Sequence, residues 1–248
     1  MNDALHQLTS RIRDARRITV MTGAGVSAAS GVPTFRGPGG LWRQYHPEEL
    51  ATAQAFARDP SLVWEWYEWR RERIASCTPN RAHEVLASWS QRSSSCRIVT
   101  QNVDDLHVRA GTRGLVRLHG SIWELSCWRR CASAPRTWRD EHVPLPERPP
   151  RCRFCDGVAR PAVVWFGESL DPADVAAAHD ASSCDVFLTV GTSAIVYPAA
   201  AFVHDAKQCG AFTAEINLEP TPASSVVDVA IHGPAEEILG NIEAMLGG

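Results

Sequence analysis

The stretch that decides the fold reads ITVMTGAGVSAASGVPTFRGPGGLW and covers residues 18–42. It begins with a short run of apolar and β-branched residues, which is typical of a buried strand. Gly23, Gly25 and a small residue three positions later then follow in the spacing of a dinucleotide fingerprint, which allows a tight turn and close approach of a pyrophosphate. The same turn also occurs without any ligand. The glycine-rich segment behind it carries Phe35 and Arg36, which favours a loop that covers a bound nucleotide.

Length, charge and apolar content exclude several classes of protein. The 248 residues suit one large domain, or one domain with a small module. The formal charge of -3 argues against a nucleic-acid binder that relies on phosphate contacts. No apolar run approaches the roughly 18 residues of a membrane span, and the N-terminus does not resemble a signal peptide. We therefore expect a cytoplasmic enzyme without nucleic-acid or membrane partners, and the sequence leaves the oligomeric state unknown.

The rest of the chain alternates predicted strands and helices, which is typical of an α/β fold with a doubly wound, mostly parallel sheet. The predicted helices cover residues 3–16, 60–76, 81–91 and 235–246, and the further strands cover residues 97–100, 116–120, 185–190, 213–216 and 227–231. Glycine or polar residues follow most of these strands. Because the carboxyl ends of parallel strands meet at one edge, we expect the ligand site there.

One strand end carries a histidine. His119, followed by Gly120, can act as a general base because imidazole titrates near neutral pH. Another strand end carries Gln101, Asn102 and Asp104. A lone histidine is often structural, so the residues by themselves leave both interpretations open.

Four of the eight cysteines form two close pairs that are separated by 20 residues. This arrangement predicts tetrahedral coordination of one Zn²⁺, and four protein ligands make the site structural. The predicted ligands are Cys127, Cys131, Cys152 and Cys155. The other four are expected to be small buried hydrophobic residues: Cys77, Cys96, Cys184 and Cys209.

The predicted helix 60–76 presents an unusual face. Val63, Tyr67, Arg70 and Ile74 lie on one side of it. A guanidinium and a phenol on an apolar face can bind a carboxylate through charge-assisted hydrogen bonds. Alternatively, Arg70 packs only its stem and extends its head group into water.

Taken together, these motifs resemble the sirtuin family of NAD-dependent protein lysine deacylases. The resemblance rests on the two cysteine pairs and on residues 23–28, 31–36, 100–104, 118–120, 163–168, 190–193 and 216–217. It implies a Rossmann-like domain that binds NAD, formed by residues 1–42, 81–120 and 161–248. It also implies a small domain, made of a helical insertion at residues 43–80 and a zinc-binding module at residues 121–160.

The chain departs from the family pattern at two places. Ala29 stands where the family usually has glutamate, at the border of the loop. Cys127 and Cys131 are separated by three residues, where two are commonest. The second departure bears on the geometry of the zinc site and leaves its ligand set intact.

The resemblance also implies roles for individual residues. His119 would be the catalytic base that acts on a ribose hydroxyl, and the products would be nicotinamide, free lysine and O-acyl-ADP-ribose. The implied NAD contacts are Gly23, Ala24, Gly25, Ser27, Phe35, Arg36, Trp42, Gln101, Asn102, Asp104, Gly191, Thr192, Ser193, Asn217, Glu219 and Ala235. The implied contacts to the acyl-lysine protein substrate are Tyr67, Arg70, Val164, Trp165, Phe166 and Gly167, the last four by pairing with the peptide backbone.

Within the family, Tyr67 and Arg70 are similar to the pair that marks enzymes acting on acidic acyl groups. This implies a desuccinylase or demalonylase, with glutaryl and acetyl groups as further substrates. Ala51 is similar to the small residue at the back of the acyl pocket in that class.

Two other functions stay open at this point. A related fold transfers ADP-ribose to protein or hydrolyses NAD, and the Tyr67 and Arg70 pair argues against it because neither reaction uses an acyl carboxylate. A non-catalytic binding module built on the zinc site is opposed by His119 and the polar strand end at residues 101–104.

Overall fold

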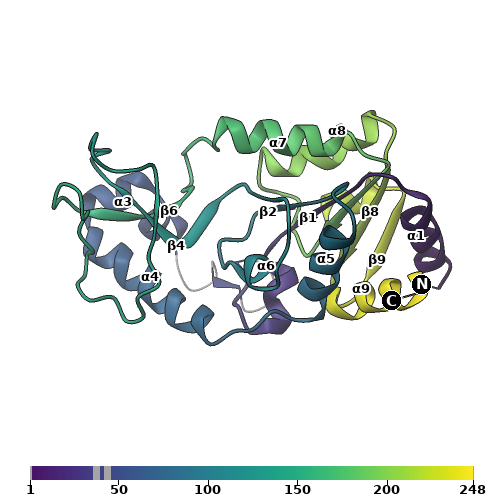
Figure 1. The fold of residues 1–248 in the computed structure, drawn as a ribbon, viewed down its shortest axis with the longest axis horizontal. Coiled ribbons are helices and arrows are strands. Elements are labelled where there is room, and N and C mark those ends of the chain that lie inside the picture. The colour runs from purple at the N-terminus through teal and green to yellow at the C-terminus, as the bar shows by residue number, and fades with distance from the viewer. Residues whose placement is uncertain (1, 36–39, 42–45, 248) are drawn as a thin grey trace.

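A computed structural model of the protein describes residues 2–35, 40–41 and 46–247. The large sheet and its helices form the right-hand part of Figure 1, and a smaller group of helices and strands forms the left-hand part. The two termini lie side by side at the far right. Within the described ranges, no helix combines the length and the apolar composition that are needed to cross a membrane.

Six parallel strands form the large sheet in the order β3-β2-β1-β7-β8-β9. They are β1 (Ile18–Thr22), β2 (Cys96–Thr100), β3 (Leu115–Arg117), β7 (Val186–Val190), β8 (Phe212–Asn217) and β9 (Val229–His232). The strand order reverses at β1, which pairs with β2 on one side and with β7 on the other. A crevice for a ligand opens outside the carboxyl ends of the strands at such a switch point. The turn after β1 therefore lies where a ligand is expected.

Helices cover both faces of the large sheet. On one face lie α1 (Asn2–Asp14), α5 (Arg81–Arg92) and α9 (Ala235–Leu246), and on the other lie α7 (Pro172–Ser182) and α8 (Phe202–Gln208) (Figure 1). Each face has its own apolar core, with Leu8, Leu86 and Leu239 in one and Phe187 and Phe202 in the other. This arrangement confirms the predicted Rossmann-like, doubly wound fold.

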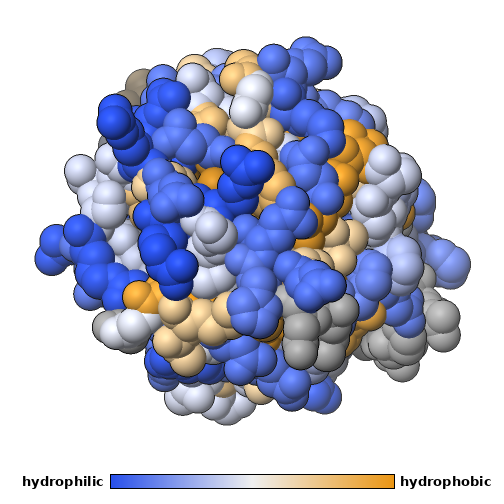
Figure 2. All heavy atoms as spheres, turned by 90° about the vertical axis from the view of Figure 1, so that its right-hand side faces the viewer, coloured by the Kyte–Doolittle hydropathy of each residue, from blue (hydrophilic) through white to orange (hydrophobic). Residues whose placement is uncertain are grey.

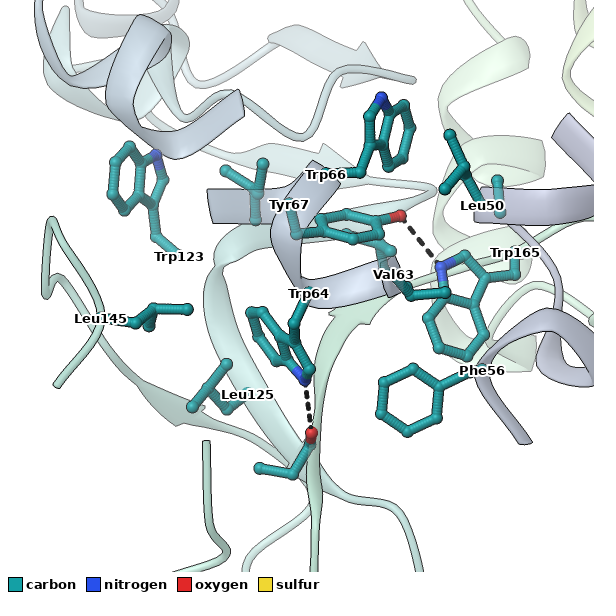
Figure 3. Packing of buried hydrophobic residues seen from close by; sticks show 14 of the residues in the cluster. Leu50, Phe56, Val63, Trp64, Trp66, Tyr67, Trp123, Leu125, Leu145 and Trp165 are labelled. Carbon is teal, nitrogen blue, oxygen red and sulfur yellow. Dashed lines mark hydrogen bonds between the residues drawn. The ribbon is translucent and has the colours of Figure 1, made fainter. Parts of the chain in front are cut away.

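The smaller part is built on three antiparallel strands. β4 (Gly120–Cys127) lies between β5 (Trp138–Arg139) and β6 (Ala159–Val163). The helices α2 (Pro47–Leu50), α3 (Ala53–Arg58) and α4 (Pro60–Ala75) share one apolar core with this sheet. Figure 3 shows the packing, in which the Trp64 indole donates a hydrogen bond to the Ala159 carbonyl at 2.8 Å. We call this group of helices and strands the small assembly.

Local signals place several helix ends. Helix α4 begins at Pro60, where the Asp59 side chain accepts a hydrogen bond from the Leu62 N–H, and it ends at Ala75, close to the prediction. Helix α9 has the predicted bounds. Helix α1 is shifted by one or two residues. The short helices α2, α3 and α6 (Leu106–Arg109), the helices α7 and α8 and the antiparallel sheet were not predicted.

Two sequence predictions are wrong in detail. The predicted strand 116–120 is two elements, because Gly120 has a φ of 79° and starts β4. A Cβ at Gly120 would lie 2.1 Å from the Ala162 carbonyl, so only glycine lets the chain turn against β6 there. Cys77, Cys96 and Cys184 are buried as predicted, whereas Cys209 is exposed because it follows the last turn of α8.

The right-hand end of the molecule carries α1, β9 and both termini. Figure 2 looks onto this end and shows mostly hydrophilic side chains, with the hydrophobic ones in small separate groups. The polar sides of the outer helices account for this surface, because their apolar sides are buried in the sheet core.

Candidate functional site

A cavity of about 1020 Å³ opens at the carboxyl ends of the large sheet and extends to the small assembly. Its wall includes the catalytic candidate and these predicted NAD contacts: His119, Gly23, Ala24, Gly25, Phe35, Gln101, Asn102, Gly191, Thr192, Ser193, Asn217 and Glu219. It also includes all the predicted acyl and peptide contacts: Tyr67, Arg70, Val164, Trp165, Phe166 and Gly167. Residues that we did not predict complete it, among them Trp66, Ile195, Tyr197 and Leu218. The fold thus brings most of the predicted site residues to one cavity.

The glycine turn after β1 packs against the turn after β7. The Gly25 N–H donates a hydrogen bond to the Gly191 carbonyl at 2.8 Å, and a Cβ on Gly25 would lie 2.7 Å from the Gly191 Cα. Gly191 itself has a φ of 59°. The glycines are therefore required by the contact between two backbone turns, in addition to any role toward a phosphate. The turn continues into the 3-10 helix η1 (Ala24–Ser30).

Three predicted NAD contacts do not line the cavity. Ser27 and Asp104 are buried behind its wall, where the Ser27 hydroxyl donates to the Asp104 carboxylate at 2.8 Å. Asn102 stands in front of them and donates to the Gly23 carbonyl at 3.1 Å and to the Ser27 hydroxyl at 3.2 Å. Ser27 and Asp104 thus hold Asn102 on the wall. Ala235 lies in the core at the start of α9.

Two other predicted NAD contacts, Arg36 and Trp42, lie outside the described residues. The structure therefore leaves their predicted roles as they were.

A pair of buried histidines lies behind this polar layer. The rings of His83 and His107 are 4.9 Å apart, and His107 Nε2 is 2.9 Å from the Thr22 hydroxyl. Burial lowers the pKa of His83 to about 4 and that of His107 to about 3, so both rings are neutral at neutral pH. No sequence pattern marks this pair, because its members are 24 positions apart and belong to different helices.

His119 has the geometry of a neutral base. Its Nδ1 lies 3.0 Å from the Gln101 carbonyl oxygen, which can only accept a hydrogen bond. Nδ1 therefore carries the proton, and Nε2 has the lone pair. Burial lowers the pKa of His119, and the hydrogen bond to Gln101 opposes part of that shift. At neutral pH the imidazole can accept a proton at Nε2 on the cavity wall.

Arg70 is buried on the cavity wall, with 7% of its surface exposed. Its guanidinium carbon lies 4.9 Å from the ring centre of Phe35, 4.8 Å from that of Trp66 and 5.4 Å from that of Tyr67. In the part of the chain that the structure describes, no carboxylate forms an ion pair with it. The alternative in which Arg70 reaches into water is therefore wrong. Burial lowers the pKa of Arg70, and the neighbouring Tyr67 opposes this shift.

The segment after β6 forms backbone hydrogen bonds to His119 at one end and to Ala51 at the other. The Val164 N–H donates to the His119 carbonyl at 3.0 Å, and the Phe166 N–H donates to the Ala51 carbonyl at 2.9 Å. These N–H groups are engaged within the chain. Pairing with a substrate peptide, which stays a prediction, would have to use other backbone groups of this segment.

The four predicted zinc ligands converge. Their Sγ atoms lie within 4.8 Å of one another, with 3.6 Å between Cys127 and Cys155 and 3.9 Å between Cys131 and Cys152. A tetrahedral zinc with Zn–S bonds of about 2.3 Å requires sulfur atoms about 3.8 Å apart. The wider spacing of the first pair is thus compatible with one structural zinc. None of the four cysteines lines the cavity.

Comparison with known proteins identifies the family. The profile of the Sir2 family matches residues 23–198. The chain belongs to the Sir2 family. A curated relative, NAD-dependent protein deacylase 2 of Pyrobaculum aerophilum, is 51% identical over 229 residues, which cover 92% of this chain and 90% of the relative.

Two further Sir2 proteins extend the comparison. The mitochondrial NAD-dependent protein deacylase sirtuin-5 of Danio rerio is 43% identical, with 91% of this chain and 81% of the relative covered. A crystal structure of a Sir2 homolog–NAD complex superposes with a TM-score of 0.87 at 41% identity and covers 98% of this chain and 95% of its own. The sirtuin prediction is confirmed, and the predicted enzyme class agrees with the names of the two relatives.

Proposed function

We propose that this Sir2-family protein is an NAD-dependent protein-lysine deacylase that prefers acidic acyl groups, succinyl and malonyl in particular and glutaryl in addition. The observation that carries the acyl preference is the buried Arg70, which faces the cavity beside Tyr67 and forms no ion pair with a carboxylate of the described residues. The acyl-lysine would enter between the predicted NAD-binding and small domains. A cytoplasmic location stays a prediction.

The energetics favour an anionic ligand at Arg70. Three aromatic rings hold the guanidinium, and cation–π contacts are worth up to about 2 kcal/mol each when they are desolvated. They do not satisfy its N–H groups. Hydrogen bonds to a charged partner contribute about 1.5–3 kcal/mol each. A carboxylate at the end of the acyl chain can therefore form charged hydrogen bonds with Arg70, which an acetyl group cannot form.

The chain's own residues support the chemistry of a deacylase. When bound, NAD supplies an electrophilic ribose carbon and nicotinamide as the leaving group. Its phosphates would lie on the Gly23 turn, and its nicotinamide end beside Gln101 and Asn102, where the cavity is lined by Phe35. The Nε2 atom of His119 would accept a proton from a ribose hydroxyl. A zinc held by all four cysteines would have no open coordination position and would stay outside this chemistry.

Substitution of Arg70 tests the acyl preference. In Arg70→Met the ratio of kcat/KM for succinyl over acetyl peptides should fall roughly 10²-fold, because the carboxylate loses its charged partner. The matched control is Arg73→Met, three residues on in the same helix, where the arginine is exposed and lies over the Trp69 ring. A parallel loss of both activities in Arg70→Met would show that Arg70 supports structure and would refute the acyl preference.

Substitution of His119 tests the catalytic base. His119→Tyr should lower deacylation by roughly 10²-fold or more and leave zinc content and melting temperature unchanged. In the wild type, kcat/KM should hold to a lower pH than the value of about 6.5 at which an ordinary histidine titrates, because the pKa of His119 is lowered, and it should then decline because protonation removes the base. Activity of His119→Tyr within a few-fold of the wild type would exclude this role. Mass spectrometry of the products would reveal protein ADP-ribosylation or free ADP-ribose, the marks of the alternative reactions.

A further inference from the structure

The hydroxyl of Tyr67 is held by a tryptophan on another segment. The Trp165 indole N–H donates a hydrogen bond to the Tyr67 hydroxyl oxygen at 2.9 Å (Figure 3). The positively charged guanidinium of Arg70 lies beside the same phenol. Because the phenol oxygen is the acceptor in this contact, its hydrogen is left to donate elsewhere. Burial raises the pKa of Tyr67, so the hydroxyl keeps that hydrogen at neutral pH.

Trp165 is itself fixed on three sides. The Arg160 guanidinium carbon lies 3.6 Å from the centre of its ring. Glu168 binds Arg160 with both carboxylate oxygens, at 2.5 and 2.8 Å, and accepts the backbone N–H of Trp165 at 2.9 Å. The Phe56 ring lies 5.2 Å from the indole. The indole N–H therefore has a defined direction, and it points at Tyr67.

We propose that Trp165 is a specificity-determining positioning residue, whose indole N–H sets Tyr67 as a hydrogen-bond donor toward the carboxylate of an acidic acyl group. A phenylalanine at position 165 would fill similar space and stack on Arg160, but it has no N–H. The hydrogen of the Tyr67 hydroxyl could then rotate toward other acceptors, which would leave the oxygen lone pairs facing the carboxylate, where two acceptors repel each other. This inference rests on the proposed preference for acidic acyl groups and adds a residue that acts through Tyr67.

A double-mutant cycle tests the proposal. The ratio of kcat/KM for succinyl over acetyl peptides is measured for the wild type, Trp165→Phe, Tyr67→Phe and the double variant, so that losses common to both peptides cancel. Trp165→Phe should lower the ratio about threefold to tenfold, the scale of one neutral hydrogen bond. In the Tyr67→Phe background the same change should have no further effect on the ratio.

A neighbouring tryptophan provides the matched control. The Trp128 ring lies 6.4 Å from that of Trp165 and 5.0 Å from that of Phe56, and within the described part of the chain no hydrogen bond or ring contact joins Trp128 to Tyr67. Trp128→Phe removes an indole N–H from the same cluster and should leave the ratio unchanged.

The possible outcomes distinguish a failure of this proposal from a failure of the proposed acyl preference. An unchanged ratio in Trp165→Phe, or losses that add in the double variant, would overturn the proposal and leave the acyl preference standing. A wild type without desuccinylation would overturn the acyl preference and this inference together. If Trp165→Phe does not fold, ¹⁵N-tryptophan labelling of wild type and Tyr67→Phe tests the same bond. Hydrogen exchange of an indole N–H should accelerate in Tyr67→Phe, and unchanged exchange at all nine tryptophans would overturn the proposal.

Discussion

The large sheet and the small assembly are held together by different kinds of side chain. Leucine, isoleucine, valine and alanine dominate the core between the sheet and α1, α5 and α9, where Trp89 is the one tryptophan among the described residues. Seven of the nine tryptophans lie in or against the core of the small assembly, and Trp42 is outside the described residues. An indole carries an N–H that needs a partner when it is buried, as those of Trp64, Trp123 and Trp165 have. The small assembly therefore depends on specific polar contacts as well as on apolar area.

A buried arginine of the small assembly shows the same dependence on polar partners. Arg71 of α4 is fully buried, and it donates to the Ile122 carbonyl at 2.8 Å and to the Asp140 carboxylate at 2.7 Å. Asp105 lies where the two parts meet and accepts hydrogen bonds from Ser121 and Arg139. Apolar burial tolerates small adjustments, whereas the loss of one partner leaves a buried charge unpaired. We therefore expect the small assembly to unfold before the large sheet when such a partner is lost.

Removal of zinc should have the largest effect on the stability of the small assembly. Chelation, or Cys152→Ser, should unfold β4 to β6 and abolish deacylation, because apparent binding energies of structural zinc reach about 10–16 kcal/mol. The large sheet should keep its hydrogen-exchange protection in β1, β7 and β8, since its cores contain none of the four ligands.

Metal analysis together with hydrogen exchange measures both parts at once. Cys209→Ser is the control, because this exposed cysteine lies far along the chain from the cluster. Equal loss of protection in both sheets would show that the two parts fold as one unit, and full activity without zinc would remove the zinc assignment.

Loss of the Arg71 side chain should have the next largest effect. Arg71→Met should lower the free energy of unfolding by about 3 kcal/mol, the lower end for a broken buried ion pair, because Asp140 is partly exposed. Urea denaturation measures the change, and the exposed Arg73 provides the control variant Arg73→Met. Equal stability of the two variants would contradict the contrast between the two parts.

Mild acid should produce the smallest change in the free energy of unfolding, and this change should come from histidines beside the large sheet. His83 and His107 have pKa values lowered to about 4 and about 3 by burial, against about 6.5 in the unfolded chain. The unfolded chain therefore binds more protons below pH 6.5, and stability is lost as the pH falls. Between pH 6.5 and 5.5 each histidine should contribute at most about 1.4 kcal/mol.

Urea denaturation at both pH values, for wild type and His107→Gln, measures this contribution. The variant should show a smaller loss over this interval. Asp104, whose pKa is raised mainly by burial, acts in the opposite direction and is common to both proteins. An identical pH dependence of the two proteins would mean that His107 takes up equally many protons in the folded and in the unfolded chain over this interval, which would contradict a pKa lowered by burial.

The sequence by itself determined the features that depend on short spacings. The apolar run and glycines of residues 18–25, the ends of helices α4 and α9, and the four cysteines were all readable, because each signal lies within a few residues or in a strict pattern of ligands. The alternation of strands and helices indicated the doubly wound sheet for the same reason. Gln101, Asn102 and His119 could be predicted because they follow strands whose carboxyl ends share one edge, whereas most other residues of the candidate site came from the resemblance to the sirtuin family.

Only the tertiary structure decided which of these residues face the cavity and what supports them. Ser27 and Asp104 lie behind the wall because they pair with each other across 77 positions, and Gly25 must be small because it meets the Gly191 turn. The bond between Trp165 and Tyr67 joins residues 98 positions apart. No local spacing encodes such contacts, since they form only when the large sheet and the small assembly place distant segments side by side.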